Sequence, residues 1–244
     1  MQTGDRVLVA GFIVTGETAK KVLIRGLGPS LTSAGVVMAD PVLQLFDGAQ
    51  SLLTTNDNWK SSQQTQIVAT GIPPPNDLES AIVVTLEPGP YTAILSGKNG
   101  GTGVGLLELY DLNPSANSHL ANISTRGFAQ TGDNVVIGGF ILGNGSGQNK
   151  VLVRAIGPSL ASLGLAGSLA DPTLALYNAE GMLVAANDNW RATQQAAIIA
   201  TGAAPTDDRE SAVVATLPPG NYTAVVAGAN GGTGVALVEI YDLP

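Results

Sequence analysis

The sequence has no cysteine, a single histidine and few aromatic residues, which make up 5 % of its 244 positions. A chain without cysteine forms no disulfide framework and no thiolate metal site. Every apolar run falls short of the roughly 20 residues that cross a bilayer, and no signal peptide is recognisable. We therefore expect no membrane insertion. Met1 stands just before a Thr-Gly-Asp segment that recurs inside the chain, which is typical of an initiator placed on a cut-out fragment or of a renumbered mature chain.

Charged residues are also scarce, at 12 %, and the acidic ones outnumber the basic ones by 19 to 11. The resulting net charge is −8 and the pI is about 4.4. Binding of nucleic acid depends on a basic surface, usually with interleaved aromatic side chains, and the sequence has neither. The composition thus excludes a nucleic-acid partner and leaves room for a cation such as calcium.

What the sequence does contain is the same unit twice. Each copy covers about 110 residues, which is near the usual size of one domain. We assign residues 1–112 to repeat 1, 113–129 to a connector and 130–244 to repeat 2. A duplicated unit favours a module built for reach, valency or assembly over a single composite active site. The clearest anchors are Asp40-Pro41, Asn56–Trp59 and Tyr110–Leu112, which return as Asp171-Pro172, Asn187–Trp190 and Tyr241–Leu243.

Each copy is predicted to be an antiparallel β-sandwich of about eight strands, jelly-roll-like, with one short helix. Alternating segments such as Val42–Asp47 and Ser51–Thr54 flank a turn at Gly48-Ala49, and 31 glycines and 14 prolines punctuate the chain. A second hairpin is expected between Tyr91–Leu95 and Val104–Tyr110. The helix is expected at 61–71 and, in the second copy, at 192–202. The predicted class is therefore all-β, with two tandem domains.

The densest polar cluster is Asn-Asp-Asn-Trp, which follows a strand in both copies. Hard cations take several oxygens that converge from a loop, so the cluster and a second acidic segment form a candidate calcium site. The spacing differs from a dedicated calcium loop and favours the alternative, an Asx turn with a helix cap and a core tryptophan. Calcium is the one cofactor that the sequence suggests. The candidate ligands are Asn56, Asp57, Asn58, Asp77 and Glu79, and in repeat 2 Asn187, Asp188, Asn189, Asp208 and Glu210.

Arg25 and Arg154 lie at the ends of apolar strands. An arginine half-buried on a sheet needs a carboxylate partner, so an internal ion pair is the favoured interpretation. The candidate partners of Arg25 are Glu79 and Glu108, and those of Arg154 are Glu210 and Glu239.

The sequence gives little support to catalysis. The single histidine, His119, lies in the connector and is absent from both copies, which argues against a serine–histidine–acid arrangement. Asp57 and Glu79 leave open a paired-carboxylate glycoside hydrolase, although the copies lack the long loops that build a cleft. We expect no enzyme.

The connector contains a strand-like segment, with Leu120, Ile123, Thr125 and Phe128 as its apolar and β-branched positions. Repeat 1 has no counterpart of this segment. If the segment completes a sheet of repeat 2, repeat 1 is left with an open edge. Another subunit could fill that edge and build a head-to-tail fibre by strand addition.

A further set of shared segments lies in the later two thirds of each copy. They are Asp40-Pro41, Leu45–Asp47, Asn56-Asp57, Pro88–Thr92 and Gly103, and in repeat 2 Asp171-Pro172, Tyr177, Asn187-Asp188, Pro219–Thr223 and Gly234. In these segments the chain resembles the bacterial pre-peptidase C-terminal domain and related β-sandwich repeats of secreted proteins. That resemblance implies an extracellular or cell-surface accessory module, sometimes calcium-assisted, that does not catalyse.

We therefore interpret the chain as a non-catalytic extracellular structural or adhesive repeat module. Its expected partners are further copies of itself, or other surface proteins and glycans. The alternative is a calcium-assisted module that binds carbohydrate or matrix.

Overall fold

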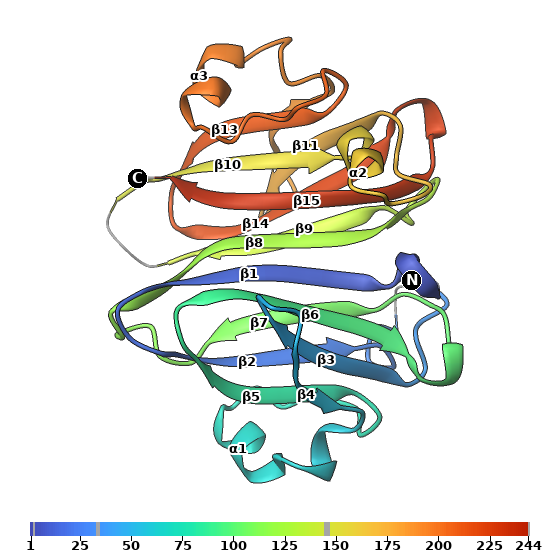
Figure 1. Cartoon of the computed structure of the whole chain (residues 1–244), viewed down its shortest axis with the longest axis vertical. Helices are drawn as coiled ribbons and strands as arrows, with labels where there is room; N and C mark the ends of the chain where they lie inside the picture. Colours follow the sequence, from blue (N-terminus) through green and yellow to red (C-terminus); the bar gives the residue numbers. More distant parts are fainter. Residues whose placement is uncertain (2, 33–34, 144–146, 244) are drawn as a thin grey trace. The chain divides into compact units, whose positions relative to one another are not determined.

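The computed structural model of the chain describes residues 1, 3–32, 35–143 and 147–243 (Figure 1). The described residues are mostly β-strand, in antiparallel sheets, with a few short helices. This confirms the expected β-rich class. The chain divides into two compact units, Met1–Ala121 and Asn122–Pro244, so the boundary falls inside the predicted connector.

Unit 1 contains two antiparallel sheets. The first has the order β1-β6-β3-β4 and the second the order β5-β2-β7. Within the second sheet, β2 is the central strand and β7 lies at one edge. The strands are β1 (Leu8–Gly16), β2 (Lys20–Leu27), β3 (Pro41–Asp47), β4 (Leu52–Asn56), β5 (Ser80–Leu86), β6 (Gly89–Gly97) and β7 (Leu106–Asp111).

Unit 2 repeats this plan with one addition. Its first sheet has the order β12-β11-β14-β9, and its second contains β13-β10-β15-β8. The added strand is β8, which the connector supplies. The strands are β8 (Ser118–Ala129), β9 (Val136–Leu142), β10 (Asn149–Ile156), β11 (Pro172–Asn178), β12 (Leu183–Asn187), β13 (Ser211–Leu217), β14 (Gly220–Gly228) and β15 (Gly234–Leu243).

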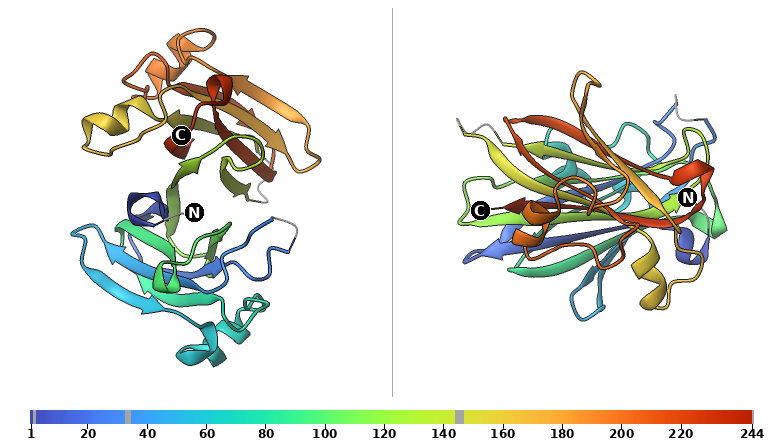
Figure 2. Two further views of the ribbon diagram at one scale, coloured as in Figure 1. Left: turned by 90° about the vertical axis from the view of Figure 1, so that its right-hand side faces the viewer. Right: turned by 90° about the horizontal axis from the view of Figure 1, so that it is seen from above.

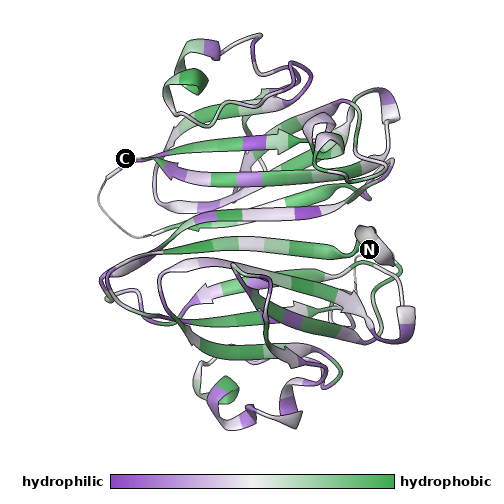
Figure 3. Ribbon diagram, in the orientation of Figure 1, coloured by the Kyte–Doolittle hydropathy of each residue, from purple (hydrophilic) through white to green (hydrophobic). Residues whose placement is uncertain are grey.

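The two sheets of each unit share one apolar core. In unit 1 the core joins Phe12 and Leu45 of the first sheet to Ile24 and Ile82 of the second. Strand alternation produces this arrangement, because side chains at every second position point to the same face. Figure 2 gives two further views of the strands, and Figure 3 shows apolar residues concentrated on them.

The predicted helices are shorter than the sequence pattern indicates. The segment 61–71 contains only α1 (Gln64–Ala69), preceded by the 3₁₀ turn η2 (Trp59–Ser61), and 192–202 contains only α3 (Gln195–Ala200). Each presents one buried isoleucine, Ile67 or Ile198, to its own unit. The remaining helical pieces are α2 (Pro158–Ser162), η1 (Gly4–Arg6), η3 (Lys98–Gly100) and η4 (Ala229–Gly231).

The two predicted hairpins have different outcomes. β3 and β4 pair around the expected turn, with Leu43 opposite Asn56. The second prediction is wrong, because β6 pairs with β1 and β3 while β7 pairs with β2 in the other sheet. The glycine-rich segment between them changes sheets instead of closing a hairpin. Asn99 at φ 53° and Gly100 at φ 78° supply the left-handed backbone for this change.

Candidate functional site

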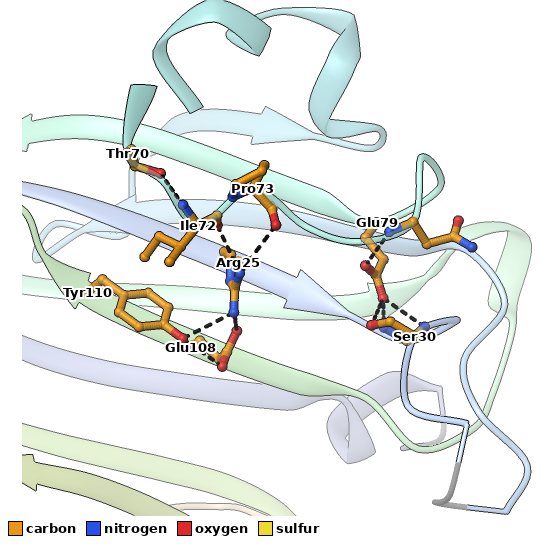
Figure 4. A network of polar contacts seen from close by, with 10 residues as sticks. Arg25, Ser30, Thr70, Ile72, Pro73, Glu79, Glu108 and Tyr110 are labelled. Carbon is orange, nitrogen blue, oxygen red and sulfur yellow. Dashed lines mark hydrogen bonds and ion pairs between the residues drawn. The ribbon is translucent and has the colours of Figure 1, made fainter. Parts of the chain in front are cut away.

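Arg25 lies in β2 and pairs with Glu108 of β7 (Figure 4). Its Nε donates to Glu108 Oε2 at 2.8 Å, its Nη1 donates to the Ile72 carbonyl oxygen at 2.8 Å, and its Nη2 donates to Tyr110 Oη at 3.1 Å. The Tyr110 hydroxyl in turn donates to Glu108 Oε1 at 2.9 Å. Burial, followed by the hydrogen bond to Glu108, raises the pKa of Tyr110. The guanidinium N–H groups of Arg25 therefore donate to partners within unit 1.

The second copy repeats this network around Arg154. Its Nε donates to Glu239 Oε2 at 3.0 Å, and its Nη1 donates to the Ala203 carbonyl oxygen at 2.6 Å. Burial is the largest factor that raises the pKa of Tyr241, to about 12. Of the predicted carboxylate partners, the structure brings Glu108 and Glu239 to the arginines.

Glu79 and Glu210, the other two candidates, have a different role. Glu79 is fully buried and accepts hydrogen bonds from the backbone N–H groups of Gly28, Ser30 and Asn76 at 3.0–3.1 Å. It also accepts one from the Ser30 hydroxyl. Glu210 does the same for Gly157 and Ser159. These carboxylates anchor the Gly-Pro-Ser turn, and in this structure they are not presented to a substrate.

The glycine of that turn is sterically required. A Cβ on Gly28 would lie 2.2 Å from the Met38 carbonyl oxygen, and one on Gly157 would lie 2.2 Å from the Leu169 carbonyl oxygen. Because the backbone passes so close, only glycine fits. The turn and its buried glutamate thus form one structural unit in each copy.

The Asn-Asp-Asn-Trp cluster is partly a structural clamp. Asn56 is buried, its Oδ1 accepts from the Ala81 N–H at 2.9 Å, and its Nδ2 donates to the Asn58 carbonyl oxygen at 3.2 Å. Trp59 is buried and its Nε1 donates to the Asn76 carbonyl oxygen at 3.1 Å. Asn187 and Trp190 make the same contacts in unit 2.

The candidate calcium ligands do not converge as one set. Asp77 pairs with Lys60 at the surface, and Asp208 pairs with Arg191. In unit 1, where Asn56 and Glu79 are engaged inside the unit, Asp57 and Asn58 each keep one side-chain oxygen without a partner. Their Oδ1 atoms are buried without a hydrogen-bond partner. Among the described residues, no group of three or more His, Cys, Asp or Glu side chains is placed to hold a metal.

Near Asp57 the two copies differ in a way that sequence reasoning missed. Lys98 Nζ lies 2.6 Å from Asp57 Oδ2 and 3.5 Å from Asp40 Oδ2. Hydrogen bonding to Asp57 is the main factor that raises the pKa of Lys98. In unit 2, Ala229 stands in place of Lys98, and the carboxylates equivalent to Asp40 and Asp57 are Asp171 and Asp188.

The backbone at this position is the same in both units. The N–H of Lys98 donates to the Asp40 carbonyl oxygen at 2.9 Å, and the N–H of Ala229 donates to the Asp171 carbonyl oxygen at 2.9 Å. The carboxylates of unit 2 therefore lack the ammonium group of unit 1. Asp40 Oδ1 and Asp171 Oδ1 are both buried without a hydrogen-bond partner, so this feature is common to the two units. In unit 2 the charge of Arg209 interacts with Asp171. A position-by-position alignment of the two copies reveals the exchange of Lys98 for Ala229.

The connector strand β8 completes the second sheet of unit 2. Its residues pair antiparallel with β15, with Ile123 opposite Ile240, Thr125 opposite Val238 and Phe128 opposite Val235. Asn122 Nδ2 donates to the Ile240 carbonyl oxygen at 3.1 Å. Leu120, the remaining predicted position, packs against the core of unit 1. His119, also in β8, is exposed.

Strand β7 of unit 1 has the same sequence pattern as β15, but no described strand pairs with it on that side. Leu106–Asp111 corresponds to Leu237–Asp242, and β7 ends the sheet β5-β2-β7. Side chains of β15, which β8 covers, are more deeply buried than the equivalent side chains of β7. The side chains of Val238 and Ile240 are 0 % and 6 % exposed, whereas the equivalent Leu107 and Leu109 are only half-buried.

Comparison with known proteins adds little. No protein-family profile and no curated protein matches the chain, and none of the described helices is long and apolar enough to cross a membrane. A structure of Sulfolobus Turreted Icosahedral Virus is 12 % identical over 97 % of this chain and 89 % of its own, with a TM-score of 0.26. The major capsid protein of bacteriophage PM2 is 8 % identical over 100 % and 94 %, with a TM-score of 0.24. Likeness at this level carries no argument about what the chain does.

Proposed function

We propose that the chain is a non-catalytic structural module of two tandem, jelly-roll-like β-sandwiches that associates with further copies through the open edge of β7. The observation that carries this proposal is the contrast between β7 and β15. The two strands share a sequence pattern, yet within the part of the chain that the structure describes β15 is paired on its outer side and β7 is not. An unpaired edge of this kind is a ready template for another strand.

The polar networks support a structural role. The arginine and glutamate side chains that the sequence suggested as candidate site residues make hydrogen bonds within their own units. The same hydrogen bonds occur in both copies. A catalytic carboxylate needs access to its substrate, and Glu79 and Glu210 are fully buried. An extracellular or cell-surface location is the part of the proposal that rests on the resemblance to secreted β-sandwich repeats.

The direct test is the mass of the chain in solution as a function of concentration. Light scattering should show mass rising with concentration, and electron microscopy should show short filaments. Leu106→Lys should reduce association, because Leu106 is 41 % exposed on β7 and a lysine on an edge strand opposes pairing. Leu52→Lys places the same charge on β4, the edge of the other sheet, and should leave association intact. A monomer at every concentration, or equal effects of the two lysines, contradicts the proposal.

A second candidate function is calcium-assisted binding of carbohydrate or matrix, and the exchange of Lys98 for Ala229 favours it in unit 2. The paired carboxylates of unit 1 are neutralised by an ammonium ion. The equivalent Asp171 and Asp188 lack that cation, and carboxylate and amide oxygens are suitable calcium ligands. Glycan-array binding that depends on calcium would support this candidate.

A further inference from the structure

Among the described residues, the two sheets of unit 2 differ in how their outer sides are covered. On the second sheet, Leu152 of β10 packs against Trp190 and against Ile198 of α3, on the side away from the shared core. The first sheet, β12-β11-β14-β9, buries one side in that core through residues such as Leu174 and Val226. The alternate positions of these four strands form its opposite side, here named the outer face of unit 2.

The outer face of unit 2 is uncharged and partly apolar. The four strands β9, β11, β12 and β14 contain no Asp, Glu, Lys or Arg residue, although the chain carries a net charge of −8. Ile137, Ile141 and Val184 project from this face and are 53 %, 71 % and 41 % exposed. A contiguous uncharged face with exposed apolar side chains indicates an interaction surface.

The register of the sheet arranges this face in rows of small and large side chains. Ala175 of β11 stands opposite Ala186 of β12 on one side and Val225 of β14 on the other. Val225 in turn stands opposite Ile137 of β9. From β12 to β9, this row therefore runs from two small side chains to two large ones.

The neighbouring row has the reverse order. Tyr177 of β11 stands opposite Thr223 of β14, and Thr223 stands opposite Gly139 of β9. Val184 lies beside Tyr177, where the register of β12 shifts. From β12 to β9, this row runs from two large side chains to two smaller ones.

The two rows make the face complementary to itself. A two-fold axis parallel to the strands, between β11 and β14, places β11 of one copy over β14 of a second copy and β12 over β9. Ala175 then faces Val225 of the second copy, and Tyr177 faces Thr223 of the second copy. Small side chains thus meet large ones in both rows, as in sheets that pack face to face with interdigitating side chains.

The charge of the chain favours a second copy as the occupant of this face. Two chains that each carry a net charge of −8 repel one another, and the repulsion is least where neither surface is charged. A cationic partner would find no carboxylate on these four strands. The face therefore fits an uncharged surface of the same kind.

The size of the face indicates a weak contact. Four strands about 4.8 Å apart, with about seven residues of about 3.3 Å each, give a face of about 19 Å by 23 Å. Stacking two such faces covers about 900 Å², which is less than the roughly 1,200–2,000 Å² of stable protein–protein interfaces. Association through it should be reversible and visible at high concentration.

We propose that two copies of the chain associate through the outer face of unit 2, stacked about a two-fold axis parallel to its strands. The contact is closed, because both copies use the same surface and each surface is then covered. It involves a surface other than the β7 edge and does not rest on the proposed function.

Sedimentation equilibrium of the full chain tests this proposal, with Leu106→Lys in every sample to weaken association through β7. We expect a monomer–dimer equilibrium that shifts toward dimer as salt rises, because salt screens the repulsion between acidic chains. Val225→Lys should weaken dimerisation by at least about tenfold, since it places an unpaired charge in the contact. Ala175→Lys, on the other interior strand, should do the same. Thr216→Lys, at an exposed position of β13, is the matched control and should leave the dimer unchanged.

A side-chain exchange tests the two-fold arrangement without adding charge. Ala175→Val alone places valine against valine, and Val225→Ala alone places alanine against alanine, so each should weaken dimerisation by about threefold to tenfold. The double variant restores one small and one large side chain at each contact and should recover at least half of the lost association. Thermal unfolding of every variant shows whether its fold is retained.

Several results would overturn the inference. They are a monomer at every concentration, equal weakening by the lysines on the outer face and on β13, association that decreases as salt rises, and a double variant weaker than either single one. The outcome is separate from that of the proposed function. A dimer that survives Leu106→Lys but not Val225→Lys upholds this contact, and association that is lost with Leu106→Lys but insensitive to Val225→Lys upholds the β7 edge alone.

Discussion

Met1 pairs with Gly103 through two backbone hydrogen bonds, as Ala129 pairs with Gly234 at the equivalent place in the second unit. In unit 2, β8 covers the outer side of β15, while β7 of unit 1 has no described strand on its outer side. This difference between two similar units is the observation on which the proposed association rests.

The buried glutamates should be required for stability. Glu210→Gln keeps the shape of the side chain but removes the charge that four hydrogen bonds stabilise. We expect the free energy of unfolding of unit 2 to fall by about 2–4 kcal/mol. Urea unfolding followed by Trp190 fluorescence in a Trp59→Phe background measures it, because each unit has one tryptophan. The exposed Glu180→Gln is the matched control, and an equal effect of both substitutions would refute the structural role of Glu210.

The arginine networks should behave as coupled pairs. Arg25→Met leaves the Glu108 carboxylate partly buried without its partner, and we expect a loss of about 3–5 kcal/mol in unit 1. The double variant Arg25→Met with Glu108→Leu should recover much of that loss, because neither charge remains. A double-mutant cycle by urea unfolding checks this. Additive losses would show that the two side chains do not interact energetically.

The pKa of Tyr241 predicts a stability change at high pH. Burial raises that pKa from 10.0 to about 12 in the folded chain. Above pH 10 the unfolded chain loses a proton that the folded chain keeps, so the free energy of unfolding should fall as pH rises from 10 to about 12. Ultraviolet titration of the phenols should show a component that titrates near 12, and this component should disappear in Tyr241→Phe. A Tyr241 that titrates near 10 in the folded chain would contradict the prediction.

Calcium should distinguish the two units. If Asp171 and Asp188 take a cation, saturating calcium at about 100 times Kd stabilises unit 2 by about 2.7 kcal/mol. Ala229→Lys should abolish the gain, because the ammonium group then neutralises the carboxylates as Lys98 does in unit 1. Lys98→Ala should create a calcium response in unit 1. A calcium response that survives Ala229→Lys would place the ion elsewhere.

Local features were the most predictable from sequence. The turn at Gly48-Ala49 joins two neighbouring alternating segments, so its hairpin could be read directly. The hairpin expected after Tyr91 was wrong because the sheet partner of β7 is β2, some 80 residues away, and alternation does not identify a distant partner. The same limit applies to β8. Its strand character was predictable from its residues, but its pairing with β15 could be inferred only by comparing the two copies and noting that repeat 1 has no corresponding segment.

Among the polar sites, too, some features could be predicted from local sequence and others depend on distant strand pairing. That Arg25 needs an acid followed from its place on an apolar strand, but the choice of Glu108 over Glu79 depends on the β2–β7 register. The role of Glu79 was out of reach, because its partners are mainly backbone N–H groups, which every sequence contains. Lys20 was also missed. It is fully buried, and its Nζ donates to Asp111 Oδ2 at 2.9 Å and to the Asn113 carbonyl oxygen at 2.8 Å.

Hydrogen exchange of the Leu107 and Leu109 amides in dilute and concentrated chain tests the central claim most directly. We expect fast exchange in dilute solution and at least about tenfold slower exchange at high concentration, as the β7 edge becomes occupied by another copy. The amides of Val238 and Ile240 should be protected in both, because β8 covers β15. Exchange at Leu107 and Leu109 that is independent of concentration, whether fast or slow, would contradict association through this edge.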